Sequence, residues 1–281
     1  MSPGPVPRAT RAPRPARRVL LLGALLGLGF CLPALLAPWL APHDPLALEL
    51  LAALAPPDAL HPLGTDEQGA DVLSRLLYGA RISLIVGLAT VAVSASVGIA
   101  VGLLAGYAGG WVEQLAMRVV DVLLAFPGLL LAIGLVAVLG PGLGNVVIAL
   151  SALGWTGFAR LVRGQVLTVK PRDYVQAAAS LGAGHLRLMA VHILPNVLAP
   201  VLVQASFGIA AAILSEASLS FLGLGVPAGT PSWGAMLAEG RHVLVEAPRV
   251  SIVPGLAIMA VVLGFNLLGD ALGDWLDPRR R

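Results

Sequence analysis

Long runs of apolar residues, separated by short charged segments, dominate this sequence. Each run reaches the length of about 20 residues that a helix needs to cross roughly 30 Å of lipid hydrocarbon. The run over residues 122–159 is too long for one crossing, and Gly140, Pro141, Gly142 and Gly144 favour a tight turn in its middle. The pattern therefore predicts six membrane-spanning helices, at residues 19–41, 82–105, 117–139, 145–166, 200–223 and 250–270.

Composition supports an all-α integral membrane protein. Of the 281 residues, 57% are hydrophobic and 12% are charged, whereas an ordinary soluble domain has about 25% charged residues. Only helices and closed barrels satisfy their backbone polar groups in lipid, and these runs have the length of helices. We expect one helix at residues 19–41, an extramembrane segment at residues 42–81, and a core of five helices within residues 82–281.

The positive charges predict the orientation of the chain. All but four of the 18 Lys and Arg residues lie on one side of the predicted spans, and the exceptions are Arg75, Arg81, Arg241 and Arg249. Because such charges concentrate on the cytoplasmic side, both termini are expected in the cytoplasm. The same distribution explains the net charge of +3, so we expect no nucleic-acid partner.

The N-terminal segment has two parts. Residues 1–18 are rich in Pro, Arg and Ala and have no apolar face, which predicts a disordered cytoplasmic tail. The basic residues before the first run are also found in secretory signals. The apolar run at residues 19–41 is longer than a usual signal core and further spans follow it, which favours an uncleaved anchor.

The most informative polar segment, residues 170–196, follows the fourth predicted span. Pro171 disfavours continuation of that span. Asp173 is suited to cap a new helix, and Gln176 three residues later completes a capping-box pattern. Gly182 is expected to end this short helix, because glycine adopts the left-handed conformation at little cost.

Apolar residues in this segment recur at helical spacing, which predicts two short amphipathic helices. The residues alone leave two placements open. The helices could lie on the bilayer surface, or they could dock a cytoplasmic partner. The two faces consist of Tyr174, Ala177, Ala178 and Leu181 in the first helix, and of Leu186, Met189, Ala190 and Ile193 in the second helix, which Pro195 is expected to end.

The segment resembles the EAA loop of ABC-importer permeases. That loop has Glu-Ala-Ala, then Gly after three residues, then Ile-x-Leu-Pro after nine more. Two positions depart from the pattern: Gln176 replaces Glu, which removes a charge, and His192 replaces Ile. The matching residues are Gln176-Ala177-Ala178, Gly182 and Ile193-Leu194-Pro195, at the family's spacing.

Four further motifs resemble the dipeptide, oligopeptide and nickel branch of these permeases, in its second-permease form. They occupy residues 61–84, 216–225, 231–237 and 265–279. The resemblance implies the type I ABC-importer permease fold in a bacterial inner membrane. It also implies a cargo of di- or oligopeptides, with nickel and glutathione as the alternatives.

The resemblance implies several protein partners. These are a second, homologous permease subunit, two ATPase subunits and an extracytoplasmic substrate-binding protein. ATP and Mg²⁺ would be bound by the ATPases, and no cofactor by this chain, which has no phosphate-loop motif and is expected not to be an enzyme. The implied ATPase-coupling residues are Asp173, Tyr174, Gln176, Ala177, Ala178, Leu181, Gly182 and Pro195.

Other polar residues are weaker candidates for a site. Glu216 falls near the predicted outer interface, where it could reach water and serve as a pathway or gate residue. Asp66, Glu67 and Asp71 favour a solvated loop and helix start over a substrate clamp. We expect no resident metal, although a metal-cargo site formed by the outer histidines is a lesser alternative; these are His43, His61 and His242.

Two other functional classes remain to be weighed. An ion-coupled secondary transporter would place ionisable residues in mid-span and broken helices in matched halves. An intramembrane enzyme would need a nucleophile and base, or metal ligands, at depth. The predicted span interiors are almost free of charge, which favours the importer permease over both.

Overall fold

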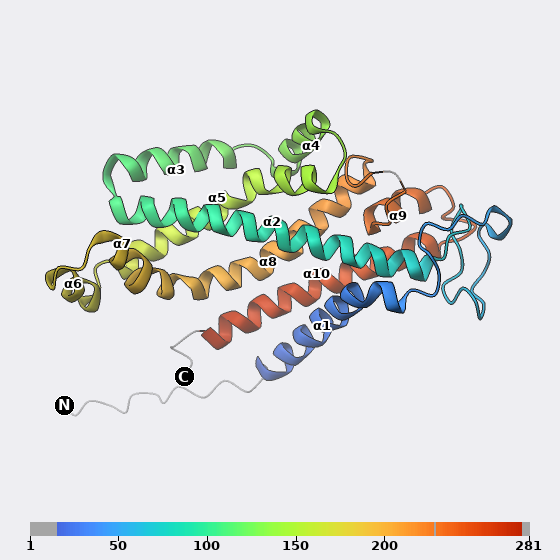
Figure 1. Ribbon diagram of the computed structural model, residues 1–281, viewed down its shortest axis with the longest axis horizontal. Coiled ribbons are helices and arrows are strands. Elements are labelled where there is room, and N and C mark those ends of the chain that lie inside the picture. The colour runs from blue at the N-terminus through green and yellow to red at the C-terminus, as the bar shows by residue number, and fades with distance from the viewer. Residues whose placement is uncertain (1–15, 228, 277–281) are drawn as a thin grey trace, which may run out of the picture.

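The computed structural model describes residues 16–227 and 229–276, and this part of the chain is a bundle of helices without named strands (Figure 1). Most of the predicted tail at residues 1–18, and the basic C-terminal end, lie outside the described residues. The helices are α1 (Ala16–Leu40), α2 (Val72–Ala108), α3 (Gly110–Leu124), α4 (Gly128–Leu139), α5 (Leu143–Val169), α6 (Asp173–Ser180), α7 (His185–Arg187), α8 (Leu194–Phe221), α9 (Trp233–Gly240) and α10 (Arg249–Leu276), with a 3₁₀ turn at Leu50–Ala52 and a π-helix at Leu188–Ile193.

Four helices of the described chain are long and apolar enough to cross a membrane. They are Val72–Ala108, Leu143–Val169, His185–Phe221 and Arg249–Leu276. The bent pair α3 and α4 would bring the number to five. The structure therefore agrees with a multi-pass, all-helical membrane protein and does not by itself establish six crossings.

The predicted third span at residues 117–139 is wrong as a single straight helix. The chain there bends by 84° between α3 and α4. Pro127 causes the break, because proline has no backbone N–H to donate and it disfavours helical geometry at the residue before it. The glycine turn at residues 140–142 then connects α4 to α5, as the sequence predicted.

Two spans begin earlier than predicted. α2 starts at Val72 rather than at residue 82. Helical structure also runs without interruption from His185 to Phe221, so Pro195 does not end a helix. Pro195 follows directly after the π-helix at Leu188–Ile193, and a local π-helical turn is one way in which a continuous helix accommodates a proline that has no N–H to donate.

The most extensive helix contact in the described chain joins α2 to α5. Gly98, Gly102 and Gly106 are one helical turn apart and face α5. A Cβ atom at position 102 would lie 2.5 Å from the carbonyl oxygen of Ala159, so only glycine lets the two backbones approach this closely. Rows of small residues at this spacing are the usual way in which membrane helices pack.

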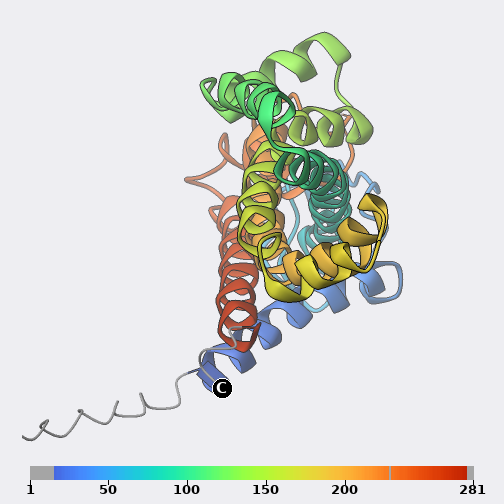
Figure 2. The same cartoon turned by 90° about the vertical axis from the view of Figure 1, so that its left-hand side faces the viewer.

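Helix α1 lies at the edge of the bundle, against α10 and α2 (Figure 2). Its Phe30 packs against Trp233 and Phe265, with ring centroids 5.4 and 6.2 Å apart. The two ends of the bundle differ in content. One carries residues 41–71 and α9, and the other carries α6 and α7 (Figure 1). By the predicted orientation, the first end is extracytoplasmic and the second cytoplasmic.

Candidate functional site

The short helix α6 forms much as its sequence predicts, with a different start. The residue before its first turn is Arg172, so Asp173 is the first helical residue and makes no capping hydrogen bond. The predicted capping box is therefore absent. Gln176 instead donates from Nε2 to the backbone carbonyl of Lys170 at 2.9 Å, which fastens α6 to the end of α5.

The predicted apolar face of α6 is not the face buried within this chain. Val175, which the pattern left out, is 2% exposed and packs in the cluster that contains Val166 and Leu188. Tyr174 is 42% exposed and Leu181 90% exposed. One face of α6 packs on the bundle, and the face that matches the family pattern stays exposed. Residue spacing alone does not show which of the two faces is buried.

Gly182 adopts the left-handed conformation that the sequence predicts, with φ of +87°. The N–H of Ala183 donates to the carbonyl of Ala178 at 3.1 Å, which closes the end of α6. A Cβ atom at position 182 would meet nothing within 4 Å, so the backbone angle, not space, requires glycine. A groove beside this turn is lined by Ala178, Leu181, Gly182, Ala183, Arg187 and His192.

The second predicted helix also divides between buried and exposed residues. Met189 and Ile193 are buried in the bundle, as expected for one face. Leu186, which the pattern placed on that face, is 79% exposed. Leu186 joins Tyr174 and Leu181 as exposed apolar side chains of the same segment; we call these three residues the loop surface.

The segment is fastened to the spans at several points. The Nζ of Lys170 donates to the carbonyl of Tyr107 at the end of α2, at 2.7 Å. The hydroxyl of Tyr107 in turn lies 2.7 Å from Nδ1 of His185. These contacts join α2, α5 and α7, so the segment that carries the loop surface is attached to the long helices.

A cavity of about 310 Å³ lies among α2, α4, α5 and α8. Its wall is largely apolar, with a few polar side chains from facing helices: Thr90, Ser94, Gln204 and Ser215. The hydroxyls of Thr90 and Ser94 are buried and have no hydrogen-bond partner in the structure. The cavity therefore offers polar groups at a depth where the rest of the lining is hydrocarbon.

Glu216 is not near water, contrary to the sequence-based expectation. Its residue exposure is 0%, and it is not among the residues that line the cavity. Ser83 and Ser220 donate hydroxyl hydrogen bonds to its carboxyl at 3.2 and 2.7 Å, and Ser232 also hydrogen-bonds it. The chain that covers it comes from α9, which sequence periodicity could not place.

Helix α9 is packed into the bundle rather than lying loose outside. Trp233 is 2% exposed, and its Nε1 donates to the carbonyl of Leu76 in α2 at 2.9 Å. Gly234 touches the backbone of Ala217 in α8 so closely that no side chain fits. Glu216 and α9 thus hold α2 and α8 together at the end of the bundle that carries residues 41–71.

Among the acidic residues before α2, Glu67 is exposed as predicted for a solvated loop, whereas Asp66 and Asp71 are buried. Asp66 is 3% exposed and pairs with Arg75. Arg75 also pairs with Glu239 of α9 at 2.7 Å. Asp71 does start α2 as predicted, because its side chain accepts a hydrogen bond from the N–H of Ser74. An arginine within an apolar helix start was the signal for this buried network, and the sequence analysis used it only for topology.

Comparison with known proteins connects these features to transport. Residues 98–281 match the family described as binding-protein-dependent transport system inner membrane component. The di/tripeptide transport system permease protein DppC of Pseudomonas aeruginosa is 49% identical over 267 residues, which is 92% of this chain and 88% of that protein.

Two further relatives differ in what their names specify. The dipeptide transport system permease protein DppC of Alkalihalophilus pseudofirmus is 42% identical over 264 residues, covering 94% of this chain and 87% of that protein. The glutathione transport system permease protein GsiD of Pectobacterium atrosepticum is 49% identical over 223 residues, covering 79% and 74%. The family match at residues 98–281 includes the loop surface, Glu216 and the part of the cavity wall formed by α4, α5 and α8.

Proposed function

This chain belongs to the family of binding-protein-dependent transport system inner membrane components, and from that membership we propose that it is a permease subunit of an ATP-driven importer of di- or oligopeptides. The family description implies a substrate-binding protein and ATPase subunits as partners. Glutathione is the second candidate cargo, because a relative of equal identity is named for it. Nickel was an alternative of the sequence resemblance, and none of the relatives described above is named for it.

The observation that carries the coupling mechanism is the loop surface. Three large apolar side chains are exposed on an ordered cytoplasmic segment that is bonded to α2 and α5. Exposed apolar groups that are held rigidly favour a protein partner. We propose that each ATPase subunit docks on such a surface, that ATP and Mg²⁺ are bound by the ATPases alone, and that this chain binds no cofactor.

In this mechanism the ATPases drive alternating access. ATP binding brings the ATPases together, the segment at residues 170–196 moves with them, and the attached helices shift the pathway from one side to the other. A bound partner can shift such an equilibrium only by its different affinity for the two states. The segment is firmly attached through Lys170, Tyr107 and Gln176, so a change in how the partner binds it is transmitted to the membrane helices.

We propose that the pathway runs along the cavity and is completed by a second, unlike permease subunit. Thr90, Ser94, Gln204 and Ser215 supply hydrogen-bonding groups without fixed charge, which suits a cargo of peptide groups. Glu216 lies behind this wall, so its proposed role is to brace the outer end of the bundle and not to contact cargo.

The docking proposal is tested with variants of α6 and its C-terminal turn. Gly182→Asp places a side chain at φ of +87°, which costs about 1 kcal/mol or more and tilts the chain that follows. Ala178→Trp fills the groove. We expect either variant to insert normally and to lose most peptide uptake in vesicles that contain all subunits, with weaker co-purification of the ATPases.

Gly184→Ala is the matched control. Position 184 has φ of −67° and open space around a Cβ atom, so uptake should stay close to the unmodified rate. Full uptake by the Gly182 and Ala178 variants together would show that the segment only rests on the bilayer. Uptake driven by an ion gradient in vesicles without ATPases would instead support a secondary transporter.

A further inference from the structure

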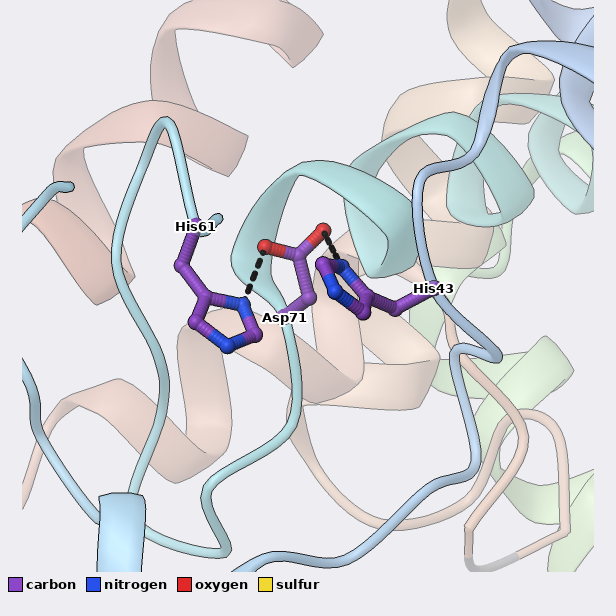
Figure 3. Close-up of side chains that lie close together, drawn as sticks. All are labelled: His43, His61 and Asp71. Atoms are coloured by element: carbon purple, nitrogen blue, oxygen red, sulfur yellow. Dashed lines mark hydrogen bonds and ion pairs between the residues drawn. The ribbon is translucent and has the colours of Figure 1, made fainter. Parts of the chain in front are cut away.

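Two histidines from separate parts of the extracytoplasmic segment meet at the carboxylate of Asp71 (Figure 3). Nδ1 of His61 lies 3.1 Å from Oδ1 of Asp71, and Nδ1 of His43 lies 4.0 Å from Oδ2. The two imidazoles are stacked, with ring centroids 4.5 Å apart. One ligand atom from each of the three residues lies within 4.8 Å of the other two.

Surrounding hydrogen bonds hold this cluster in place. Asp71 caps α2, and its Oδ2 accepts hydrogen bonds from the N–H and the hydroxyl of Ser74, at 2.8 and 2.7 Å. The same hydroxyl oxygen accepts from the backbone N–H of His43 at 3.0 Å. Ser74 therefore positions both Asp71 and His43 by hydrogen bonds, as residues that hydrogen-bond to metal ligands commonly do.

His43 provides the observation that hydrogen bonding within the chain leaves unexplained. Its Nδ1 is buried and has no hydrogen-bond partner in the structure. Buried nitrogen atoms in folded proteins are rarely without one, and each exception calls for an explanation. A cation between His43, His61 and Asp71 would use the lone pair of this nitrogen.

The electrostatics of the cluster favour a cation. Within the described residues, Asp71 makes no ion pair with Arg or Lys, and its neighbour Arg75 is engaged by Asp66 and Glu239. A second carboxylate lies beside the histidine pair, because Asp58 accepts a hydrogen bond from the backbone N–H of His61.

We propose that His43, His61 and Asp71 bind one divalent transition-metal ion of the zinc and nickel class. Two imidazole nitrogens and one carboxylate oxygen suit these ions better than magnesium or calcium, which prefer oxygen ligands alone. The side chains of His43 and His61 are 35% and 14% exposed, so an ion can enter and water can take the fourth position.

The ion would link the segment that follows α1 to the first turn of α2. It would act as a structural clamp in the extracytoplasmic segment, distinct from a cargo site, because the cluster lies outside the cavity. His242, the third outer histidine of the sequence analysis, does not join the cluster: it is exposed and accepts a hydrogen bond from Arg241. The extracytoplasmic location rests on the proposed orientation, whereas the ligand set does not.

Metal titration of the full chain, purified with its co-encoded subunits and stripped with a chelator, tests this proposal. We expect one Zn²⁺ per chain, visible absorption of a low-coordinate Co²⁺ site on substitution, and a higher melting temperature with Zn²⁺. His43→Gln or His61→Gln should weaken Zn²⁺ binding at least tenfold and remove the melting shift. The matched control His242→Gln should bind as the unmodified chain does.

A conservative variant separates ligand loss from misfolding. His61→Cys keeps a zinc ligand at the same place, so it should retain binding that His61→Gln loses. Equal Zn²⁺ binding by every variant, or no binding by the unmodified chain, would overturn the metal site and leave a hydrogen-bonded histidine–aspartate cluster. Because this measurement needs no transport, it can fail while the importer proposal stands, and the reverse also holds.

Discussion

At the scale of single residues, Glu216 shows how one carboxyl group can join three helices. Glu216 belongs to α8. Its partner Ser83 lies in α2, and its partner Ser232 is the N-cap residue of α9. Three hydroxyl donors satisfy the oxygens of a side chain that is fully buried. Removing such a group leaves several buried hydroxyls without an acceptor, which is destabilising.

We therefore predict different results for two substitutions of this residue. Glu216→Gln keeps a carbonyl acceptor in the same place and should retain most uptake and thermal stability. Glu216→Ala should lower stability by about 1–3 kcal/mol, since it leaves the serine hydroxyls unpaired. Thermal unfolding of the purified complex and peptide uptake would measure both, and loss of uptake by a stable Glu216→Gln protein would contradict the bracing role.

Residues differ in how far the sequence could place them. Gly182 was predictable, because a left-handed helix end is a local requirement of the backbone. Glu216, Asp66 and His43 were not, since their burial and partners depend on segments that are distant in the chain and carry no regular period. Their surroundings follow from how α9 and residues 41–71 fold back onto the bundle.

At the scale of elements, the close contact between α2 and α5 depends on a row of three glycines in α2. The row at positions 98, 102 and 106 brings α2 against the backbone of α5 near Ala159 and Arg163. Burial of apolar surface gives little advantage to helix association inside lipid, so close packing must supply it. Glycines four residues apart are a signal for this contact that the sequence itself contains.

A matched pair of alanine substitutions tests the element contact. Gly102→Ala should lower stability by about 1–3 kcal/mol, because the added methyl meets the Ala159 carbonyl. Gly164→Ala in α5 has open space around its Cβ and should be neutral or slightly stabilising through its higher helix propensity. Thermal unfolding in detergent compares the two, and equal stability would show that the contact is looser than described.

Prolines explain which element boundaries were predictable. Hydropathy located the apolar runs well, because lipid imposes a length and a composition on any crossing helix. It missed the break at Pro127, and Pro195 was interpreted as a break that is absent. The difference lies in context: Pro127 separates two helices, whereas Pro195 lies inside one continuous helical segment, directly after its π-helical turn.

At the scale of the whole molecule, the predicted orientation can be checked by cysteine labelling. Cys31 is the one cysteine of the chain, so it is first replaced by Ala. Cysteines at the exposed positions Asp44 and Val245 should react with a membrane-impermeant reagent from outside. Cysteines at the exposed positions Gly110 and Leu181 should react only after the membrane is permeabilised. Labelling of position 181 from outside would end the importer reading.

The assembly itself gives a second prediction at this scale. Gln176 lacks the charge that the family pattern has at that position, and the sequence motifs resemble the second of two unlike permeases. Purification with the co-encoded proteins should therefore yield this chain and another permease in equal amounts with two ATPases. Transport by a complex that contains two copies of this chain and no other permease would contradict the pairing.

The continuous helical segment from His185 to Phe221 connects the two ends of the bundle. It has 37 residues, of which Leu188–Ile193 are π-helical, and at the α-helical rise it would be about 55 Å long. Its N-terminal end carries Leu186 of the loop surface, and its C-terminal end carries Glu216. If such a rod pivots at its middle by roughly 10°, each end moves about 5 Å and the two ends move in opposite directions. Closing one end of this subunit and opening the other would then be a single motion, set by one piece of secondary structure.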